Sequence, residues 1–130
     1  MSRQTLERWH RIVRERDHAA LSALLTEDCV FLSPVVHTPH RGRDITLLYL
    51  GGAMQVLQNG FHYVREIADE QQAVLEFECT VDDIHVNGVD IMSFAGDGRI
   101  RELKVMVRPL KAITTLHAKM AAMLEALKVT

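Results

Sequence analysis

The chain has 130 residues, of which 48% are hydrophobic and 25% are charged, a balance typical of one globular domain and unlike a disordered or fibrous chain. Its 15 basic and 17 acidic side chains give a formal charge of −2, so we expect no nucleic-acid partner. It shows neither a signal peptide nor an apolar run long enough to cross a bilayer, so we expect a cytoplasmic protein with no membrane partner.

The first segment is rich in arginine, yet its pattern is that of an amphipathic helix. Leu6, Trp9 and Ile12 recur at helical spacing, and Leu21, Leu24 and Leu25 mark a second short helix. The basic residues of this segment are interleaved with acidic ones, which indicates a solvated face; they are Arg3, Arg8, Arg11, Arg14 and Arg16.

A strand is expected next, followed by a third helix. Residues 30–36 are apolar and β-branched around Pro34, and a loop with further proline and histidine follows. Residues 42–58 return to a helical pattern that Gly51 and Gly52 interrupt. Because glycine weakens a helix interior, the pair indicates close packing against a neighbouring element.

From the Asn59-Gly60 turn to Pro109 the sequence has strand character. Residues 71–83 alternate between apolar and polar side chains, residues 84–95 form a second long strand, and a turn at 96–98 leads into a third at 99–108. A helix is expected over about 110–128. The sequence therefore predicts an α+β fold with helices on one face of a curved antiparallel sheet, in a single domain of residues 1–130 with its core at 3–109.

The element order, together with FLSPVVHTPHRGRDI and GVDIMSFAGDGRIRELKVMVRPL, resembles the SnoaL-like branch of the nuclear transport factor two-like superfamily. This resemblance covers nearly the whole chain up to Pro109. It implies a cone, also called a cystatin-like fold, in which the sheet wraps around the N-terminal helices and encloses a pocket. Members include ketosteroid isomerases, polyketide cyclases, epoxide hydrolases and non-enzymatic binders, so the fold alone does not fix the function.

Asp90 is the sharpest candidate for a catalytic residue. Strand alternation places it on the same side as Val86, Met92 and Phe94, among apolar side chains. Burial there disfavours the charged carboxylate, raises its pKa and lets the neutral acid donate a hydrogen bond. The segment DIMSFAGDG is also similar to the ketosteroid isomerase segment that carries a protonated aspartic acid. The alternative is an acid that only satisfies a buried donor.

The other roles implied by these relatives are not filled. The resemblance places the isomerase base at Ser33, whose hydroxyl is no base at neutral pH, and the isomerase tyrosine at Trp9, which keeps only an N–H donor. The cyclases carry an acid on the last long strand, where this chain has none after Glu102. The acid and arginine set of the epoxide hydrolases is not recovered either.

His37 is the second catalytic candidate, as a general base in the loop at the expected pocket mouth. The spacing of His37, His40, His62 and His85 shows no converging ligand set, so no metal is expected, and no cofactor motif is present.

A small, mainly apolar organic molecule is the expected partner. The ligand-binding residues predicted around the pocket are Trp9, Phe31, Ser33, Tyr49, Phe77, Met92, Leu103, Val105 and Val107. The leading hypothesis is ligand binding with acid-assisted isomerase, dehydratase or cyclase chemistry at Asp90, and the alternative is a non-catalytic homodimeric binding or interaction module. We expect a homodimer through the convex sheet face, which carries Val74, Val89, Ile91 and Met106.

Overall fold

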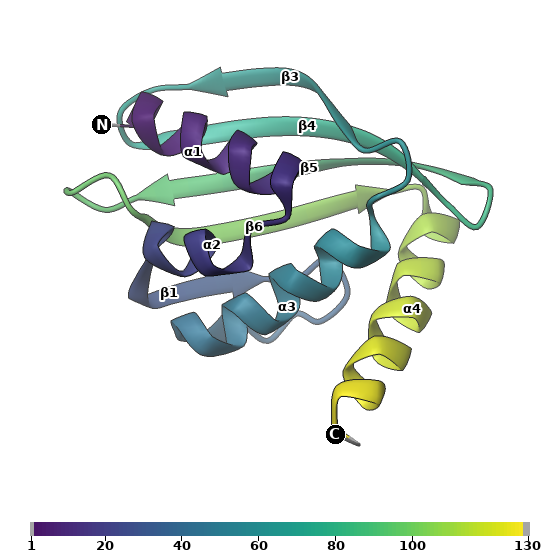
Figure 1. The fold of residues 1–130 in the computed structure, drawn as a ribbon. Coiled ribbons are helices and arrows are strands. Elements are labelled where there is room, and N and C mark those ends of the chain that lie inside the picture. The colour runs from purple at the N-terminus through teal and green to yellow at the C-terminus, as the bar shows by residue number, and fades with distance from the viewer. Residues whose placement is uncertain (1, 129–130) are drawn as a thin grey trace.

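The computed structural model describes residues 2–128, and its helices lie on one face of a sheet (Figure 1). The helices are α1 (Ser2–Glu15), α2 (His18–Leu24), α3 (Arg43–Val56) and α4 (Leu110–Lys128). The strands are β1 (Leu25–Leu32), β2 (His40–Arg41), β3 (His62–Ala68), β4 (Gln72–Val81), β5 (Ile84–Phe94) and β6 (Ile100–Arg108). The α+β class and the C-terminal helix expected from the sequence are therefore confirmed.

The six strands described form one sheet in the order β2-β1-β6-β5-β4-β3. Neighbours along the run from β3 to β6 are antiparallel, as the hairpin pattern predicts. One pair departs from the expected antiparallel arrangement, because β1 pairs with β6 in the parallel direction, so the sheet is mixed. Two strands separated by a helix and four other strands leave no local sequence signal for their relative direction.

Two element boundaries differ from the sequence prediction. Leu25, expected in the second helix, instead begins β1, and β1 ends at Leu32 rather than continuing through Pro34. Proline has no N–H to donate to the ladder, and the strand ends before it. His40 and Arg41 add a short antiparallel strand beside β1 that the loop-like sequence does not reveal.

Close packing of α3 explains its two glycines. A Cβ at Gly51 would overlap the His18 ring of α2, and a Cβ at Gly52 would lie 3.0 Å from Met120 Cε of α4. The glycines let α2 and α4 approach α3 closely, as the sequence predicts. Their placement brings three helices together on the inner face of the sheet.

The inner face of the sheet supplies most of the core. Alternate residues of β4 are buried, from Ala73 to Val81, and on β5 Val86, Asp90 and Met92 face the same way. Helix α1 packs onto this face through Trp9, and Thr5 Oγ1 donates to the Gly98 carbonyl in the β5–β6 turn. Cys29 and Cys79 are buried free thiols.

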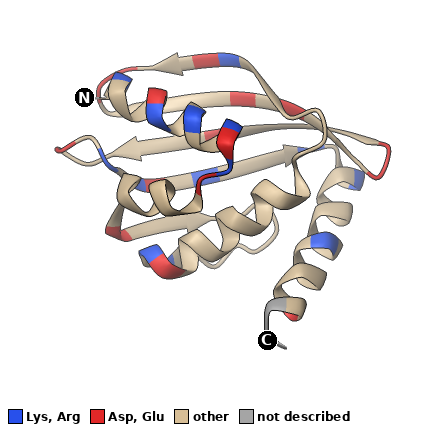
Figure 2. Ribbon diagram, in the orientation of Figure 1, with Lys and Arg blue, Asp and Glu red and all other residues tan. Residues whose placement is uncertain are grey.

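Basic residues outnumber acidic ones along α1, and Glu7 and Glu15 are interspersed among them (Figure 2). The last helix is the longest one described, with 19 residues. Within residues 2–128, none of the helices combines the length and the apolar character that crossing a bilayer requires.

Candidate functional site

Asp90 lies in the middle of β5, between Leu75 of β4 and Val105 of β6. Its side chain points to the inner face of the sheet, and the residue is 7% exposed. Burial on this face follows from strand alternation, because Met92, two residues further along, is fully buried on the same side. The carboxyl group therefore sits in largely apolar surroundings.

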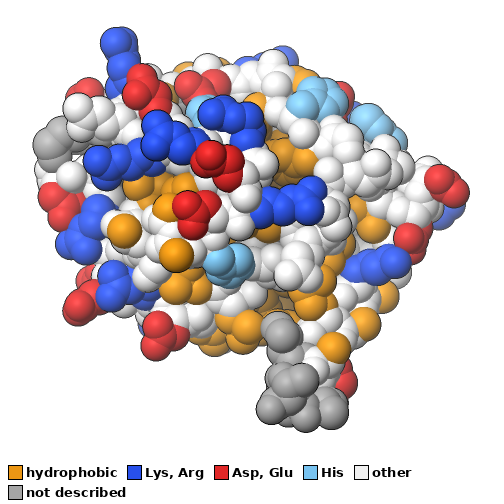
Figure 3. Space-filling view, viewed as in Figure 1, with side chains coloured by type: hydrophobic (Ala, Val, Ile, Leu, Met, Phe, Trp, Pro, Cys, Tyr) orange, Lys and Arg blue, Asp and Glu red, His pale blue; other side chains and the backbone are white. Residues whose placement is uncertain are grey.

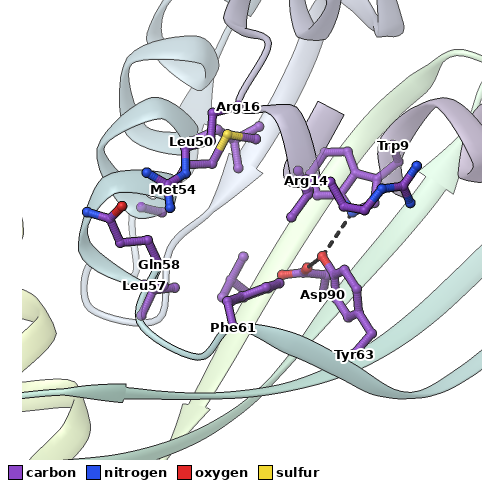
Figure 4. A pocket seen from close by; sticks show the side chains of 13 residues that line it. Trp9, Arg14, Arg16, Leu50, Met54, Leu57, Gln58, Phe61, Tyr63 and Asp90 are labelled. Atoms are coloured by element: carbon purple, nitrogen blue, oxygen red, sulfur yellow. Dashed lines mark hydrogen bonds between the residues drawn. The ribbon is translucent and has the colours of Figure 1, made fainter. Parts of the chain in front are cut away.

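A chain of two hydrogen bonds ends on Asp90. Trp9 Nε1 donates to Tyr63 Oη at 2.9 Å, and Tyr63 Oη donates to Asp90 Oδ2 at 2.8 Å. Figure 4 shows these three side chains converging from α1, β3 and β5. The other carboxyl oxygen, Oδ1, receives no hydrogen bond from any residue that the structure describes.

This environment raises the pKa values of the Asp90 carboxyl group and of the Tyr63 hydroxyl group. Burial raises the pKa of Asp90 from 3.8 to about 7, and the hydrogen bond from Tyr63 offsets part of the rise. Burial and the nearby Asp90 charge raise the pKa of Tyr63 well above its usual 10. Tyr63 therefore remains a donor throughout the neutral range, while Asp90 changes between acid and carboxylate near pH 7.

Tyr63 is the residue of this cluster that the sequence analysis missed. It pairs with Phe77 of β4, and its ring makes edge contacts with Phe77 and with Phe61. The register shifts between Tyr63 and Arg65, so apolar alternation along β3 is broken. The usable signal was the tyrosine itself, which lies three residues after the Asn59-Gly60 turn in the region predicted to have strand character.

The carboxyl group of Asp90 lines a cavity of about 210 Å³ between the sheet and α3. Trp9, Tyr63 and Asp90 lie on one side, and Figure 4 shows residues of α3 on the other. The lining side chains are mostly apolar; they belong to Trp9, Val13, Arg14, Arg16, Leu50, Ala53, Met54, Leu57, Gln58, Phe61, Tyr63, Asp90 and Val105. We call this space the Asp90 cavity.

A second cavity, of about 160 Å³, lies between β1, α3 and α4. It shares Ala53, Leu57 and Val105 with the Asp90 cavity, so these three residues form a common wall. Its lining includes Phe31, Ser33, Tyr49, Leu116 and Met120. We call it the α4 cavity.

The residues predicted around one pocket are thus distributed over two cavities and the core. Trp9 lines the Asp90 cavity, Phe31, Ser33 and Tyr49 line the α4 cavity, and Val105 lines both. The remaining predicted residues line neither cavity: Phe77, Met92 and Leu103 are buried in the core, and Val107 packs against it.

The structure does not bring the other proposed polar residues to Asp90. Ser33 Oγ accepts a hydrogen bond from the backbone N–H of Val35 at 3.0 Å, within its own loop. His37 is exposed and lines neither cavity. His37, the candidate general base, and Ser33, a predicted ligand-binding residue, therefore do not line the cavity that Asp90 lines.

The other three histidines considered as metal ligands, His40, His62 and His85, do not converge on one point. His40 stacks on Tyr49 with 4.2 Å between ring centres, whereas His62 and His85 on the sheet both approach Glu78, at 3.9 and 3.6 Å. In the described part of the chain, no three histidine, cysteine or carboxylate side chains gather in a way that would hold a metal ion.

Comparison with solved structures places this fold in a known class, the nuclear transport factor two-like or cystatin-like fold. A steroid delta-isomerase from Pseudomonas aeruginosa is 34% identical, with a TM-score of 0.95 over 99% of this chain and 95% of that one. An uncharacterized cystatin-like protein from Silicibacter pomeroyi is 32% identical, with a TM-score of 0.86 over 91% and 83%.

The chain belongs to the SnoaL-like domain family, whose model matches residues 6–103. The epoxide hydrolase/cyclase-like enzyme SalBIII of pyran ring formation in salinomycin is 19% identical, with a TM-score of 0.67 over 82% of this chain and 90% of that one. That likeness concerns the fold alone. No curated protein matches the chain in sequence.

Proposed function

We propose that this protein binds a small, mainly apolar molecule in the Asp90 cavity, in the cytoplasm, and that neutral Asp90 donates a hydrogen bond to a carbonyl or hydroxyl oxygen of that molecule. The observation that carries the proposal is the Asp90 carboxyl group itself. It is buried in the wall of an apolar cavity, with Tyr63 on one oxygen and no donor on the other among the described residues.

The two carboxyl oxygens have different roles in this proposal. Oδ2 accepts from Tyr63, so the acid proton is carried by Oδ1 when Asp90 is neutral. A proton on Oδ1 can be shared with a ligand oxygen, and negative charge that develops on this oxygen is then stabilised in a site of low polarity. The hydrogen bond from Trp9 Nε1 holds the Tyr63 hydroxyl in the orientation in which it donates to Asp90.

Such an arrangement supports acid-assisted chemistry of the isomerase, dehydratase or cyclase type. The relative from Pseudomonas aeruginosa, a steroid delta-isomerase, lends support to the isomerase form. Among the residues that line the Asp90 cavity, however, Asp90 is the one carboxyl group, and neither histidine nor cysteine is present. A reaction at this site would therefore use Asp90 as its acid, and no lining side chain would serve as its base.

Binding without catalysis is the second candidate, and the missing base favours it. The cavity also holds only about 210 Å³, below the roughly 300–1,000 Å³ usual for ligand pockets. The ligand that fits without rearrangement is therefore a single ring or a short chain.

A matched pair of probes tests the proposal. Acetophenone and ethylbenzene have nearly the same shape and differ in the carbonyl group, and their binding can be measured by calorimetry at pH 5.5 and 8.5. We expect acetophenone to bind more tightly at pH 5.5, where Asp90 is neutral, and ethylbenzene to bind equally at both. In Asp90→Asn, which titrates no proton, the pH dependence should disappear.

Equal affinity of the two probes at pH 5.5 would contradict the proposal, as would a pH dependence that survives in Asp90→Asn. Chemical denaturation of the variant separates binding from folding. If Asp90→Asn lost stability and binding together, Asp90 would be a structural residue.

We also propose that the protein forms a homodimer through the sheet face that points away from the helices. On this outer face, Ile67, Val74 and Ile91 are successive cross-strand partners, and Val89 pairs with Met106. Ile67 is 64% exposed and Met106 is 49% exposed. A partner of the same kind would cover this apolar row, which no helix of the described chain covers.

A further inference from the structure

Two arginines stand at the rim of the Asp90 cavity. Arg14 lies in the last turn of α1, and Arg16 follows in the connection to α2 with a positive φ of 55°. Both line the cavity, and both are exposed. In Figure 4, Arg14 lies beside Trp9, and Arg16 lies on the side of Leu50 and Met54.

Basic side chains gather over α1 on the face shown in Figure 3, with acidic ones among them. The sequence alone suggests a solvated helix face for all of them. The structure distinguishes Arg14 and Arg16 from the other basic residues of this segment. These two arginines line the Asp90 cavity, whereas Arg3, for example, does not.

Neither rim arginine forms an ion pair with any residue that the structure describes. Other arginines of the chain do have carboxylate partners: Arg65 lies 3.3 Å from Glu76, and Arg99 lies 2.7 Å from Asp97. Asp17, next to Arg16 in sequence, uses its carboxylate to cap α2 by accepting from the Ala20 N–H.

The cavity therefore has two chemically different ends. Its inner end carries Asp90 and Tyr63, its middle is apolar, and its rim carries two cations without carboxylate partners in the described chain. Burial and the Tyr63 hydrogen bond are the influences on the acidity of Asp90, and neither arginine is among them.

We infer that the ligand is an amphipathic carboxylic acid: its apolar body fills the Asp90 cavity, its carbonyl or hydroxyl oxygen meets Asp90, and its carboxylate lies between Arg14 and Arg16. This inference rests on the proposed function and names the class of molecule that the same site takes. A guanidinium group matches a carboxylate through two parallel N–H donors, which gives orientation as well as affinity. The cavity of about 210 Å³ takes a ligand of one ring, and residues from both ends of the site line it.

The test compares 4-acetylbenzoate with 4-acetylbenzamide, which share their ring and their acetyl carbonyl and differ in charge. Binding of each is measured by calorimetry to the full chain and to Arg14→Gln, Arg16→Gln and the double variant. Arg3→Gln, on the same helix but away from the cavity, is the matched control.

We expect the acid to bind about tenfold or more tightly than the amide to the unmodified protein. This ratio should fall toward one in the double variant, stay unchanged in Arg3→Gln and decrease with added salt, because exposed charges are screened. Amide binding should be the same in the unmodified protein and in all of the variants. The ratio in the unmodified protein is informative by itself, even if a variant were to fold poorly.

Equal affinity for acid and amide in the unmodified protein would overturn the inference, and so would a ratio that persists in the double variant. In either case, carbonyl-dependent binding of neutral acetophenone would leave the proposed function standing. If acetophenone, the acid and the amide all fail to bind, the proposed function itself fails.

Discussion

Tyr63 Oη donates a hydrogen bond to Asp90 Oδ2 across 2.8 Å, which ties the edge strand β3 to the middle of the sheet through β5. The intervening strand β4 pairs with both, so this contact spans its inner face. Since Trp9 donates to the same hydroxyl, α1 is held to the sheet by the same group. We therefore expect the stability of the protein and the pKa of its buried acid to depend on the Tyr63 hydroxyl and the Asp90 carboxyl group.

The first prediction concerns the pH dependence of stability. The pKa of Asp90 rises from 3.8 in the unfolded chain to about 7 in the folded protein, so the unfolded state releases its proton first as pH increases. The Asp90 contribution to the free energy of unfolding is complete below about pH 4, falls between pH 4 and 7 and is lost above. Its size is of order 4 kcal/mol at about 1.4 kcal/mol per pH unit.

Urea unfolding of the unmodified protein and of Asp90→Asn at pH 4, 5.5, 7 and 8.5 measures this term. The asparagine side chain of the variant does not titrate, so the variant should gain stability relative to the unmodified protein from pH 4 to 7, and the difference should then level off. A stability difference between the two proteins that stays constant from pH 4 to 8.5 would show that folding does not raise the pKa of Asp90.

The second prediction concerns Tyr63→Phe, which removes the hydroxyl and keeps the ring. Asp90 loses the bond that favours its charged form, so its pKa should rise further than in the unmodified protein, as a carboxyl-carbon NMR titration would show. Trp9 also loses its acceptor, and the combined cost in unfolding free energy should be about 1–3 kcal/mol. Tyr49→Phe is the control, because the Tyr49 hydroxyl has no hydrogen bond within the described chain. Equal effects of the two changes would contradict the assigned role of Tyr63.

The third prediction concerns Gly88, which faces the core at the site where Phe77 pairs with it. A Cβ at Gly88 would overlap the Phe77 ring and would lie 2.8 Å from the Met106 carbonyl oxygen, a backbone atom that cannot turn aside. Gly88→Ala should therefore cost about 1–3 kcal/mol or more in urea unfolding. Gly96→Ala should change stability by less than about 0.5 kcal/mol, since its Cβ would meet nothing within 4 Å. A tolerated Gly88→Ala would mean that β5 and β6 can move apart.

The fourth prediction tests the homodimer. Ile91→Lys places a charge in the centre of the outer apolar row, beside Val74 on β4. Light scattering should give a dimer mass for the unmodified protein and a monomer mass for the variant. Leu110→Lys, which changes a 77% exposed side chain at the start of α4, should leave the dimer intact. A monomer mass for the unmodified protein at high concentration would refute the proposed interface.

Local patterns in the sequence were enough to predict the main elements of this fold. Alternation around Asp90 predicts its burial, because strand periodicity is a property of neighbouring residues. The pairing of β1 with β6 and the edge of the sheet at β3 depend on contacts between distant segments. Such contacts leave no trace in local periodicity, and the bulge after Tyr63 removes even the local signal there.

The candidate site was predictable only in part for the same reason. Alternation identifies which residues face inward, but it does not show whether an inward residue borders a cavity or packs in the core. Phe77 and Met92 have the parity of Asp90 and are enclosed by neighbouring side chains, whereas Asp90 reaches the cavity wall. That difference depends on the volume that α1 and α3 leave empty above each position.

The wall shared by the two cavities has a consequence for how this fold acquires new ligands. Ala53, Leu57 and Val105 border both the Asp90 cavity and the α4 cavity. A shorter side chain at Leu57 would thin the wall between the cavity of the acid and the cavity beside the C-terminal helix. Under the proposed function, the length of molecule that the protein binds would depend on these wall residues, and it could change in evolution while the acid and its hydrogen bonds stay unchanged.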